Sequence, residues 1–540
     1  MALMTIRRRL RTSAIPSATG KNLAPVLGGF IVLVVALLLG AIAALFPASF
    51  AVKLGFLIGG LVVLVLGLLV PAGTSAPRVH LKRLLFALVL VSVAWPLYLS
   101  YHGLPGPAIN PTRLIYWTLA GLWFFWFVGS RELRAQLSSR LAMFRPFVLI
   151  LGIYLAWALF SAVLSVAPFA SIYYLVKLMI GPVLVFMVAL SCLQNRKDVD
   201  FVLLLMVLAA LIAATLGMLE AVMQKNLFYD LVPSLFPQGD EGGDVWAEKL
   251  ASDKSRAGDY RVMSTFTHPL TFGEYLALIL PIAAYLVGFA PQLWRRLLGL
   301  ITIPAILAGL YVAHTRSPLL AAGTVVIGLI GFFGVRALRK KRSFAASTIG
   351  FFVLVASVLA VVLLFGVAME LAVGRNLAEA ASTSARVAMF QRGSGLVLEQ
   401  PLVGYGPGLA AITLGFLPGF TTLTIDSYYL SVAMESGLPG LALFFGLLGY
   451  PIIRGFAASI RTPGRDGARI AVIALALLGF AVVKSVLSLT ENLDAVFLLI
   501  ALLAISLEPE NASASVELEP TRRKHGAYGR IQNGIPQYGK

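Results

Sequence analysis

The sequence is poor in charged residues and contains one cysteine. Of its 540 residues 12% are charged and 59% are hydrophobic, and the mean hydropathy is +0.89. Soluble domains carry about 25% charged residues, so a soluble globular protein is excluded. The single cysteine, Cys192, cannot form an intramolecular disulfide, and no Cys/His cluster has the spacing of a structural zinc site. Thiol and zinc chemistry are therefore not expected.

Long hydrophobic runs fill most of the chain. Stretches of about 18 to 25 apolar residues recur throughout, and each can cross a hydrocarbon core about 30 Å thick. The first run has no convincing cleavage signature, so we interpret it as a retained helix rather than a signal peptide. The sequence predicts an all-α integral membrane protein with about fourteen transmembrane helices. They are expected at 26–46, 50–70, 84–101, 112–128, 147–165, 171–191, 201–223, 270–290, 297–313, 318–335, 346–368, 428–452, 468–487 and 492–507.

Lysine and arginine collect in the even-numbered connections between these helices. Examples are Arg131, Arg134, Arg140, Arg145, Arg295, Arg296, Arg336, Arg339, Lys340, Lys341, Arg342, Arg454, Arg461, Arg465 and Arg469. Because cytoplasmic loops carry an excess of basic residues, both termini are predicted to be cytoplasmic. The net charge of +19 is therefore mainly a topology signal. Nucleic-acid binding is not expected, since no basic patch has interleaved aromatic residues.

This topology divides the chain into seven parts, two of which are long outer segments. The parts are a basic N-terminus (1–25), helices one to seven (26–223), an outer loop (224–269), helices eight to eleven (270–368), a large outer loop (369–427), helices twelve to fourteen (428–507) and a cytoplasmic tail (508–540). Outer loops of this length usually carry function. The large outer loop is the predicted catalytic segment.

Five ionisable residues fall within the predicted helices, each in the outer half of its span. They are Lys177, Glu220, Glu274, Glu435 and Lys484. Charged groups inside a bilayer are costly and tend to mark cavities, which predicts a shared polar cavity open to the outside. The alternative is that each side chain extends individually to water at the interface. An ion-coupled transporter would place such groups nearer the midplane.

Three outer segments each contain a prominent arginine. They are Arg261 in RVMSTFTHPLTFGEYL, Arg316 in AHTRSPLLA and Arg386 in STSARVAMFQRGSG. Guanidinium groups fork onto phosphate oxygens and never lose their charge, so converging arginines suit a diphosphate ligand. Alternatively, each arginine pairs with a loop carboxylate such as Asp259 or Glu399.

The segment 382–400, which contains Arg386, has an amphipathic pattern and predicts a helix that ends before Pro401. Gly404, Gly406 and Gly408 then predict a tight turn that approaches a ligand or another helix closely. A nucleotide-binding loop is disfavoured, because no strand precedes these glycines and no Walker lysine follows them.

The segment DSYYLSVAMESGLPG, at 426–440, resembles a motif of the O-antigen ligase and polymerase family. Ligases of that family have His, Asn or Ser, nine residues, Gly, two residues, and Gly, Thr or Tyr. Here Ser427, Gly437 and Gly440 keep the spacing, and Asp426 replaces the histidine. The segment RVMSTFTHP, the arginine at 316 and the turn PLVGYGPG extend the resemblance over roughly 200–500.

The resemblance implies a polytopic fold like that of GT-C glycosyltransferases, in the bacterial inner membrane. It implies transfer, with inversion and without metal or cofactor, from an undecaprenyl-diphosphate-linked glycan on the periplasmic face. Arg261, Arg316 and Arg386 would bind the diphosphate, and Asp426 would be the base or the N-cap of the twelfth helix. The residues with possible supporting roles are His268, Lys177, Glu435 and Tyr405. Expected partners are lipid-linked donor and acceptor glycans, the bilayer, and a chain-length regulator or flippase of the pathway.

The replaced histidine favours a polysaccharide polymerase of O-antigen, capsule or exopolysaccharide over a ligase that transfers finished polymer to lipid A core. A relative that glycosylates proteins, and a flippase or other transporter of lipid-linked oligosaccharides, are further alternatives. His268 and His314 are also candidates for a base or phosphate donor. A metal remains an alternative through the acidic residues of PQGDEGGDVW, which are Asp240, Glu241 and Asp244.

Overall fold

The computed structural model describes residues 78–101, 109–231, 260–339, 377–415 and 425–509, with short pieces between 348 and 359. Within these ranges the chain is mostly helical and contains no strand, only one isolated antiparallel bridge between Tyr101 and Ile109. The predicted helices at 26–46 and 50–70, most of the one at 346–368, and the acidic residues 240–244 lie outside the described residues.

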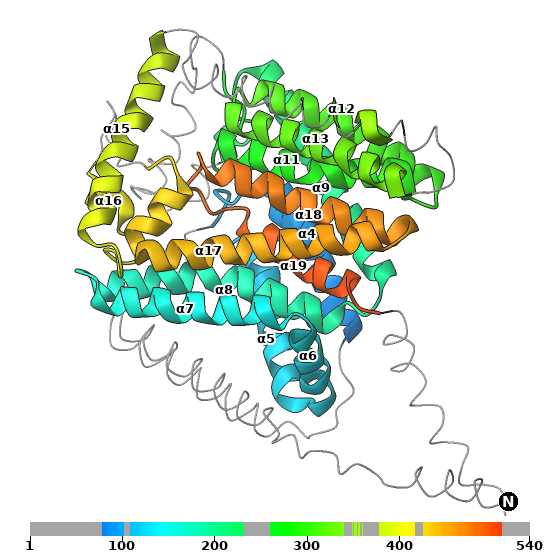
Figure 1. Cartoon of the computed structure of the whole chain (residues 1–540), viewed down its shortest axis with the longest axis horizontal. Coiled ribbons are helices and arrows are strands. Elements are labelled where there is room, and N and C mark those ends of the chain that lie inside the picture. Colours follow the sequence, from blue (N-terminus) through cyan, green and yellow to red (C-terminus); the bar gives the residue numbers. More distant parts are fainter. Residues whose placement is uncertain are drawn as a thin grey trace, which may run out of the picture. The chain divides into compact units, whose positions relative to one another are not determined.

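Figure 1 shows the order of the helices along the chain. They are α4 (Arg78–Ala94), α5 (Pro111–Gly129), α6 (Arg131–Met143), α7 (Arg145–Leu164), α8 (Pro168–Cys192), α9 (Arg196–Met223), the 3-10 turn η1 (Tyr229–Leu231), α11 (Pro269–Phe289), α12 (Leu293–Val312), α13 (Arg316–Arg339), α15 (Leu377–Glu399), α16 (Ala410–Leu414), α17 (Tyr428–Arg461), α18 (Gly464–Lys484) and α19 (Leu493–Ser506). Among these, α7, α8, α9, α11, α12, α13, α17 and α18 are long and apolar enough to cross a membrane. The chain thus fits a polytopic all-α membrane protein, as predicted.

Helix boundaries differ from the predicted ones where local chemistry overrides hydrophobicity. The helix expected to reach residue 101 ends at Ala94, because Pro96 disfavours helical backbone in the residue before it. The amphipathic helix predicted at 382–400 is present as α15 and ends at Glu399, before Pro401. A short polar helix, α6, occupies what the sequence predicted as a connection.

The chain forms two compact units of unequal size. The described part of the smaller unit is residues 124–139, from the last residues of α5 to most of α6. Within it, Arg134 Nη1 donates to the carbonyl of Phe127 at 2.8 Å, and Ser130 Oγ accepts the Leu133 N–H at 3.2 Å. The larger unit contains the other helices and all the candidate site residues.

One end of the larger unit gathers basic residues, and we call it the basic end. Arg469, only 2% exposed, pairs with Asp200 at 3.1 Å and with Asp466. Arg196 pairs with Asp466 at 2.6 Å, and Arg336 donates to the carbonyl of Gly464 at 3.0 Å. The starts of α9 and α18 therefore lie beside the end of α13, in the alternating order that the predicted topology requires.

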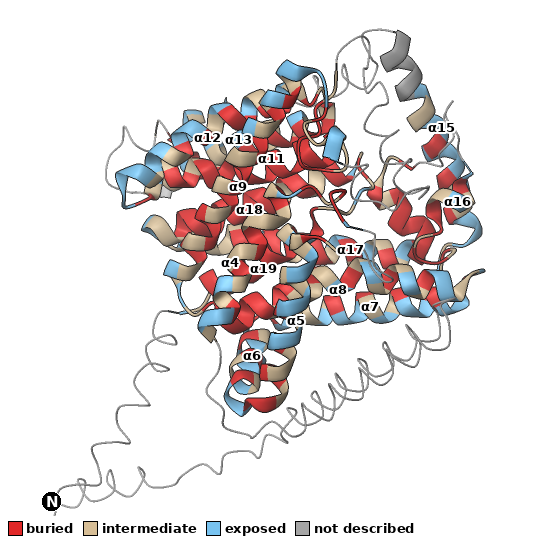
Figure 2. Cartoon of the chain, turned by 180° about the vertical axis from the view of Figure 1, so that it is seen from behind, coloured by how far each residue is buried: buried red, intermediate tan, exposed pale blue. Residues whose placement is uncertain are grey.

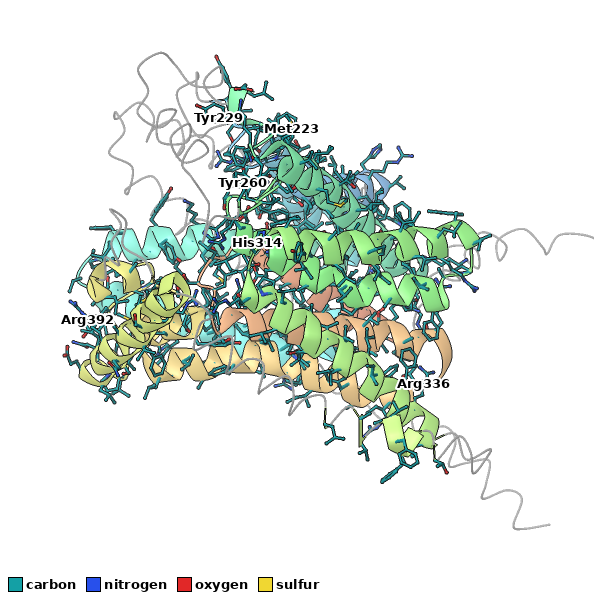
Figure 3. All side chains as sticks on the ribbon, turned by 90° about the horizontal axis from the view of Figure 1, so that it is seen from above. Met223, Tyr229, Tyr260, His314, Arg336 and Arg392 are labelled. Atoms are coloured by element: carbon teal, nitrogen blue, oxygen red, sulfur yellow. The ribbon has the colours of Figure 1, made fainter. Side chains whose placement is uncertain are left out.

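The opposite ends of the same helices form what we call the loop end. The Thr265 hydroxyl donates to the carbonyl of Val93, at the end of α4, at 2.6 Å. The Val262 N–H donates to the carbonyl of Val312, at the end of α12, at 3.3 Å. The Tyr429 hydroxyl, at the start of α17, donates to the carbonyl of Ala481 near the end of α18. Figure 3 shows Tyr260 and His314 at this end and Arg336 towards the other.

The helices α11 and α18 form the centre of the larger unit. They are the most buried of the membrane-length helices, whereas α7, α12 and α13 expose much of their surface (Figure 2). α11 packs against α9, α12, α13 and α18. The buried and apolar surfaces together indicate a core of two helices surrounded by helices that face lipid.

Candidate active site at the loop end

The segment 260–268, which carries Arg261, is fixed to the bundle by a carboxylate of α9. Glu220 is fully buried and accepts the Ser264 N–H at 2.7 Å and the Tyr260 hydroxyl at 2.9 Å. Burial raises the pKa of Tyr260, so its hydroxyl is a neutral donor. Ser264 has φ +54°, a conformation that this set of hydrogen bonds holds in place. The segment therefore presents Arg261 from a rigid backbone.

His268 ends this segment and caps α11. Its Nδ1 accepts the Leu270 N–H at 3.1 Å. In a neutral imidazole the other ring nitrogen, Nε2, then carries the proton. Between the two predicted uses of His268, this geometry favours a donor to phosphate over a base.

Arg316 begins α13 beside the same segment. Gly273, in the second turn of α11, lies against Thr315 and Pro318: a Cβ built there would be 3.0 Å from the Thr315 hydroxyl. The hydrogen bond between Val262 and Val312 brings the segment 260–268 to the same turn between α12 and α13. The structure thus places the segments of Arg261 and Arg316 next to each other.

Arg386 and Asp426, forty residues apart, form an ion pair. Arg386 Nε on α15 lies 2.9 Å from Asp426 Oδ2, just before α17. The side chains are 33% and 38% exposed, so both remain accessible. The N-cap of α17 is Ser427, whose Oγ accepts the Leu430 N–H at 3.3 Å. The capping role that the sequence allowed for Asp426 therefore belongs to its neighbour.

The glycine-rich turn 401–408, which we call the docked turn, packs against a break in α17. The N–H groups of Tyr405 and Gly406 donate to the carbonyls of Met434 and Glu435 at 2.8 and 2.9 Å. Gly437 has φ +68°, and a Cβ there would lie 2.2 Å from the carbonyl oxygen of Leu402. Of the two predicted uses of this turn, approach to a ligand or to a helix, the structure shows approach to a helix.

Two predicted supporting residues brace the docked turn. The buried carboxylate of Glu435 accepts the Ser431 hydroxyl at 3.2 Å and N–H groups of Gly408 and Ala410. The Tyr405 hydroxyl donates to Glu399 at 3.1 Å. The sequence allowed Glu399 as a partner for an arginine, but in this structure it holds a tyrosine.

Four of the five ionisable residues in the predicted spans make their contacts at three separate places in the structure. Glu220 and Glu435 bind backbone groups at different places, as described above, and Lys177 is exposed on α8. Glu274 and Lys484 form a completely buried ion pair at 2.8 Å. These separate contacts do not bring the five residues together, and the shared outer cavity stays a prediction.

Glu491 was missed by sequence reasoning. It lies between α18 and α19, and its two carboxylate oxygens accept the Thr267 N–H at 3.2 Å and the Thr267 hydroxyl at 2.7 Å. The available signal was a carboxylate in a short polar connection, SLTEN, between two apolar helices. In the parts of the chain that the structure describes, no three His, Cys, Asp or Glu residues are grouped to hold a metal ion.

Comparison with known proteins bears on the second half of this site. Residues 305–445 match a sequence-family model described as O-antigen ligase. The matched range contains Arg316, Arg386, Asp426 and the docked turn, whereas Arg261 precedes it. No curated protein matches the chain. The family match, together with the motifs it encloses, supports membership of this chain in the O-antigen ligase and polymerase family.

Proposed function

We propose that this protein is a membrane glycosyltransferase that polymerises lipid-linked repeat units into O-antigen, capsule or exopolysaccharide. The donor would be a glycan on undecaprenyl diphosphate, and the acceptor a hydroxyl of the next lipid-linked unit. The observation that carries the proposal is the Arg386–Asp426 ion pair. It places an arginine, a residue suited to binding phosphate, beside the first residue of the family motif.

The chemistry requires a stabilised leaving group. As the bond between the anomeric carbon and the diphosphate breaks, negative charge grows on the diphosphate oxygen. Arginines held in advance by the protein can stabilise this charge without a metal ion. We assign this role to Arg261, Arg316 and Arg386.

The acceptor hydroxyl also needs a base, and we assign this role to Asp426. Arg386 contacts Asp426 Oδ2 through Nε, and we assign its two Nη groups to the phosphate oxygens. The second carboxylate oxygen of Asp426 can then take the proton of the acceptor hydroxyl. Attack from the face opposite the leaving diphosphate inverts the anomeric carbon.

The competing function is ligation of finished polymer to lipid A core, which the family description itself favours by naming a ligase. A deletion strain distinguishes the two functions by its polysaccharide profile. Products with a single repeat unit indicate a polymerase, and bare core together with polymer left on the lipid carrier indicates a ligase. An unchanged profile would contradict both.

The same strain tests the arginines. Each charged contact contributes about 1.5 to 3 kcal/mol, so replacing Arg261, Arg316 or Arg386 by alanine should lower polymer about tenfold to hundredfold. Arg392, an exposed arginine on α15, provides a matched control, since its replacement should leave polymer unchanged. Normal polymer from all three site variants would show that these arginines do not bind the diphosphate.

A further inference from the structure

The connection between α18 and α19, residues 485–492, is held at both ends by one carboxylate of α11. Lys484, the last residue of α18, pairs with Glu274 Oε1 at 2.8 Å, and both side chains are fully buried. Asn492, immediately before α19, donates to Glu274 Oε2 at 2.8 Å and to the carbonyl of Thr271 at 3.0 Å. Lys484 also donates to the carbonyl of Leu489 inside the connection. This short loop is therefore rigid.

From this anchored position the loop contacts both halves of the candidate site. Glu491 accepts two hydrogen bonds from Thr267, next to His268 and in the segment of Arg261. Ser488 donates to the carbonyl of Ile425, the residue before Asp426. The two halves come from distant parts of the chain, and this loop touches each of them.

Burying a carboxylate at position 491 costs more free energy than burying a neutral hydrogen-bond acceptor would. Burial raises the pKa of Glu491, and the charge of Glu274 acts in the same direction. Lys484 faces Glu491 from the end of α18, Tyr98 faces it from the segment that follows α4, and Thr267 donates two hydrogen bonds to it. The neutral amide of glutamine would occupy this place at lower cost.

We propose that Glu491 is a positioning residue of the transfer reaction. Through Thr267 it fixes the segment that carries Arg261 and His268, while its loop fixes the backbone next to Asp426. The separation between the segment of Arg261 and the base is thereby set by residues 485–492. This role rests on the proposed function.

The test is a kinetic double-mutant cycle with the full-length protein purified in lipid nanodiscs. The substrate is the lipid-linked repeat unit extracted from the deletion strain. Glu491→Gln and Thr267→Val should each lower kcat/KM at least about tenfold, in line with losing hydrogen bonds to a charged group. The double variant should be no slower than the slower single variant, because both changes remove the same interaction.

Two matched controls belong to the cycle. Thr267→Ser keeps the hydroxyl that donates to Glu491 and should retain wild-type kcat/KM. Ser485→Ala changes an exposed hydroxyl of the same loop, which donates to the carbonyl of Val482 within its own turn, and should also be fully active. The melting temperature of Glu491→Gln should not fall below that of wild type, whereas loss of a merely structural residue would lower activity and melting temperature together.

Additive losses in the double variant, an active Glu491→Gln enzyme, or a parallel fall in melting temperature would each overturn the positioning role. Failure of the proposed function gives a different result. In that case the wild-type protein itself does not extend the lipid-linked repeat unit, and the role of Glu491 fails with it.

Discussion

Replacing Asp426 by asparagine separates a catalytic from a structural role of the Arg386–Asp426 pair. Asparagine has almost the same shape and still accepts a hydrogen bond from the guanidinium, but it cannot take a proton. The substitution also leaves the start of α17 intact, because Ser427 is the N-cap.

The two roles predict effects of very different size. Both side chains are about one third exposed, and ion pairs in such surroundings contribute only about 0 to 1 kcal/mol to stability. The melting temperature of Asp426→Asn should therefore change little. A general base contributes about 10² to 10⁴ in rate, or roughly 3 to 5.5 kcal/mol of transition-state stabilisation. Activity should accordingly fall at least about a hundredfold.

Complementation of the deletion strain, followed by gel analysis of its polysaccharide, measures the activity, and thermal unfolding of the purified protein measures stability. Ser427→Ala is the matched control: loss of the N-cap costs about 0.5 to 2 kcal/mol of stability and should leave polymer largely unchanged. Asp426→His should recover activity, since imidazole is a base near neutral pH and stands at this position in the ligase motif. Polymer of normal length and amount from Asp426→Asn would refute the assignment of Asp426 as the base.

Alkaline phosphatase fused after residue 240 should be active and after residue 340 inactive, because only the first site is predicted to lie outside; reversed activities would invert the topology. Gly437→Ala should prevent accumulation of folded protein in fluorescence-detected gel filtration, since its Cβ would lie 2.2 Å from a backbone oxygen of the docked turn, whereas Gly449→Ala, with open space around it, should behave as wild type. Burial raises the pKa of Glu491, so the folded state favours its protonated form. The contribution of this carboxyl group to stability is therefore complete only below its unfolded pKa of about 4.3, and it is lost as the pH rises through the folded pKa. The melting temperature of Glu491→Gln minus that of wild type should therefore increase as the pH rises above the unfolded pKa, and a difference independent of pH would contradict the burial of this carboxyl group.

Hydrophobic length predicted the positions of the described spans well, because the bilayer imposes one strong requirement on every helix that crosses it. The errors came from features that hydropathy averages away. Pro96 ends α4 early, and α17, which is broken at Gly437, continues to Arg461, beyond the predicted end at residue 452. Neither effect changes the number of apolar residues in a window.

The residue types of the candidate site were readable from the sequence, but their partners were not. Spacing identified Asp426, and charge identified Arg386, yet only the fold shows that α15 brings the two together. Glu491 belongs to no spacing pattern, since its partner Thr267 lies 224 residues away. Contacts between helices distant in the chain depend on the packing order of the bundle, which local patterns do not encode.

The buried pair of Glu274 and Lys484 has a consequence for how the protein is made. When α11 enters the membrane during synthesis, its carboxylate has no partner, because Asn492 is encoded 218 residues later and Lys484 shortly before that. An unpaired charge at the centre of an inserting helix costs on the order of 2.5 to 3.5 kcal/mol, and less near the interface. The insertion of α11 is therefore least favourable before α18 and α19 emerge, since only they supply the partners of Glu274. Replacing Glu274 by a neutral residue should consequently favour the insertion of α11. The same substitution should destabilise the finished bundle, because the buried Lys484 loses its carboxylate partner.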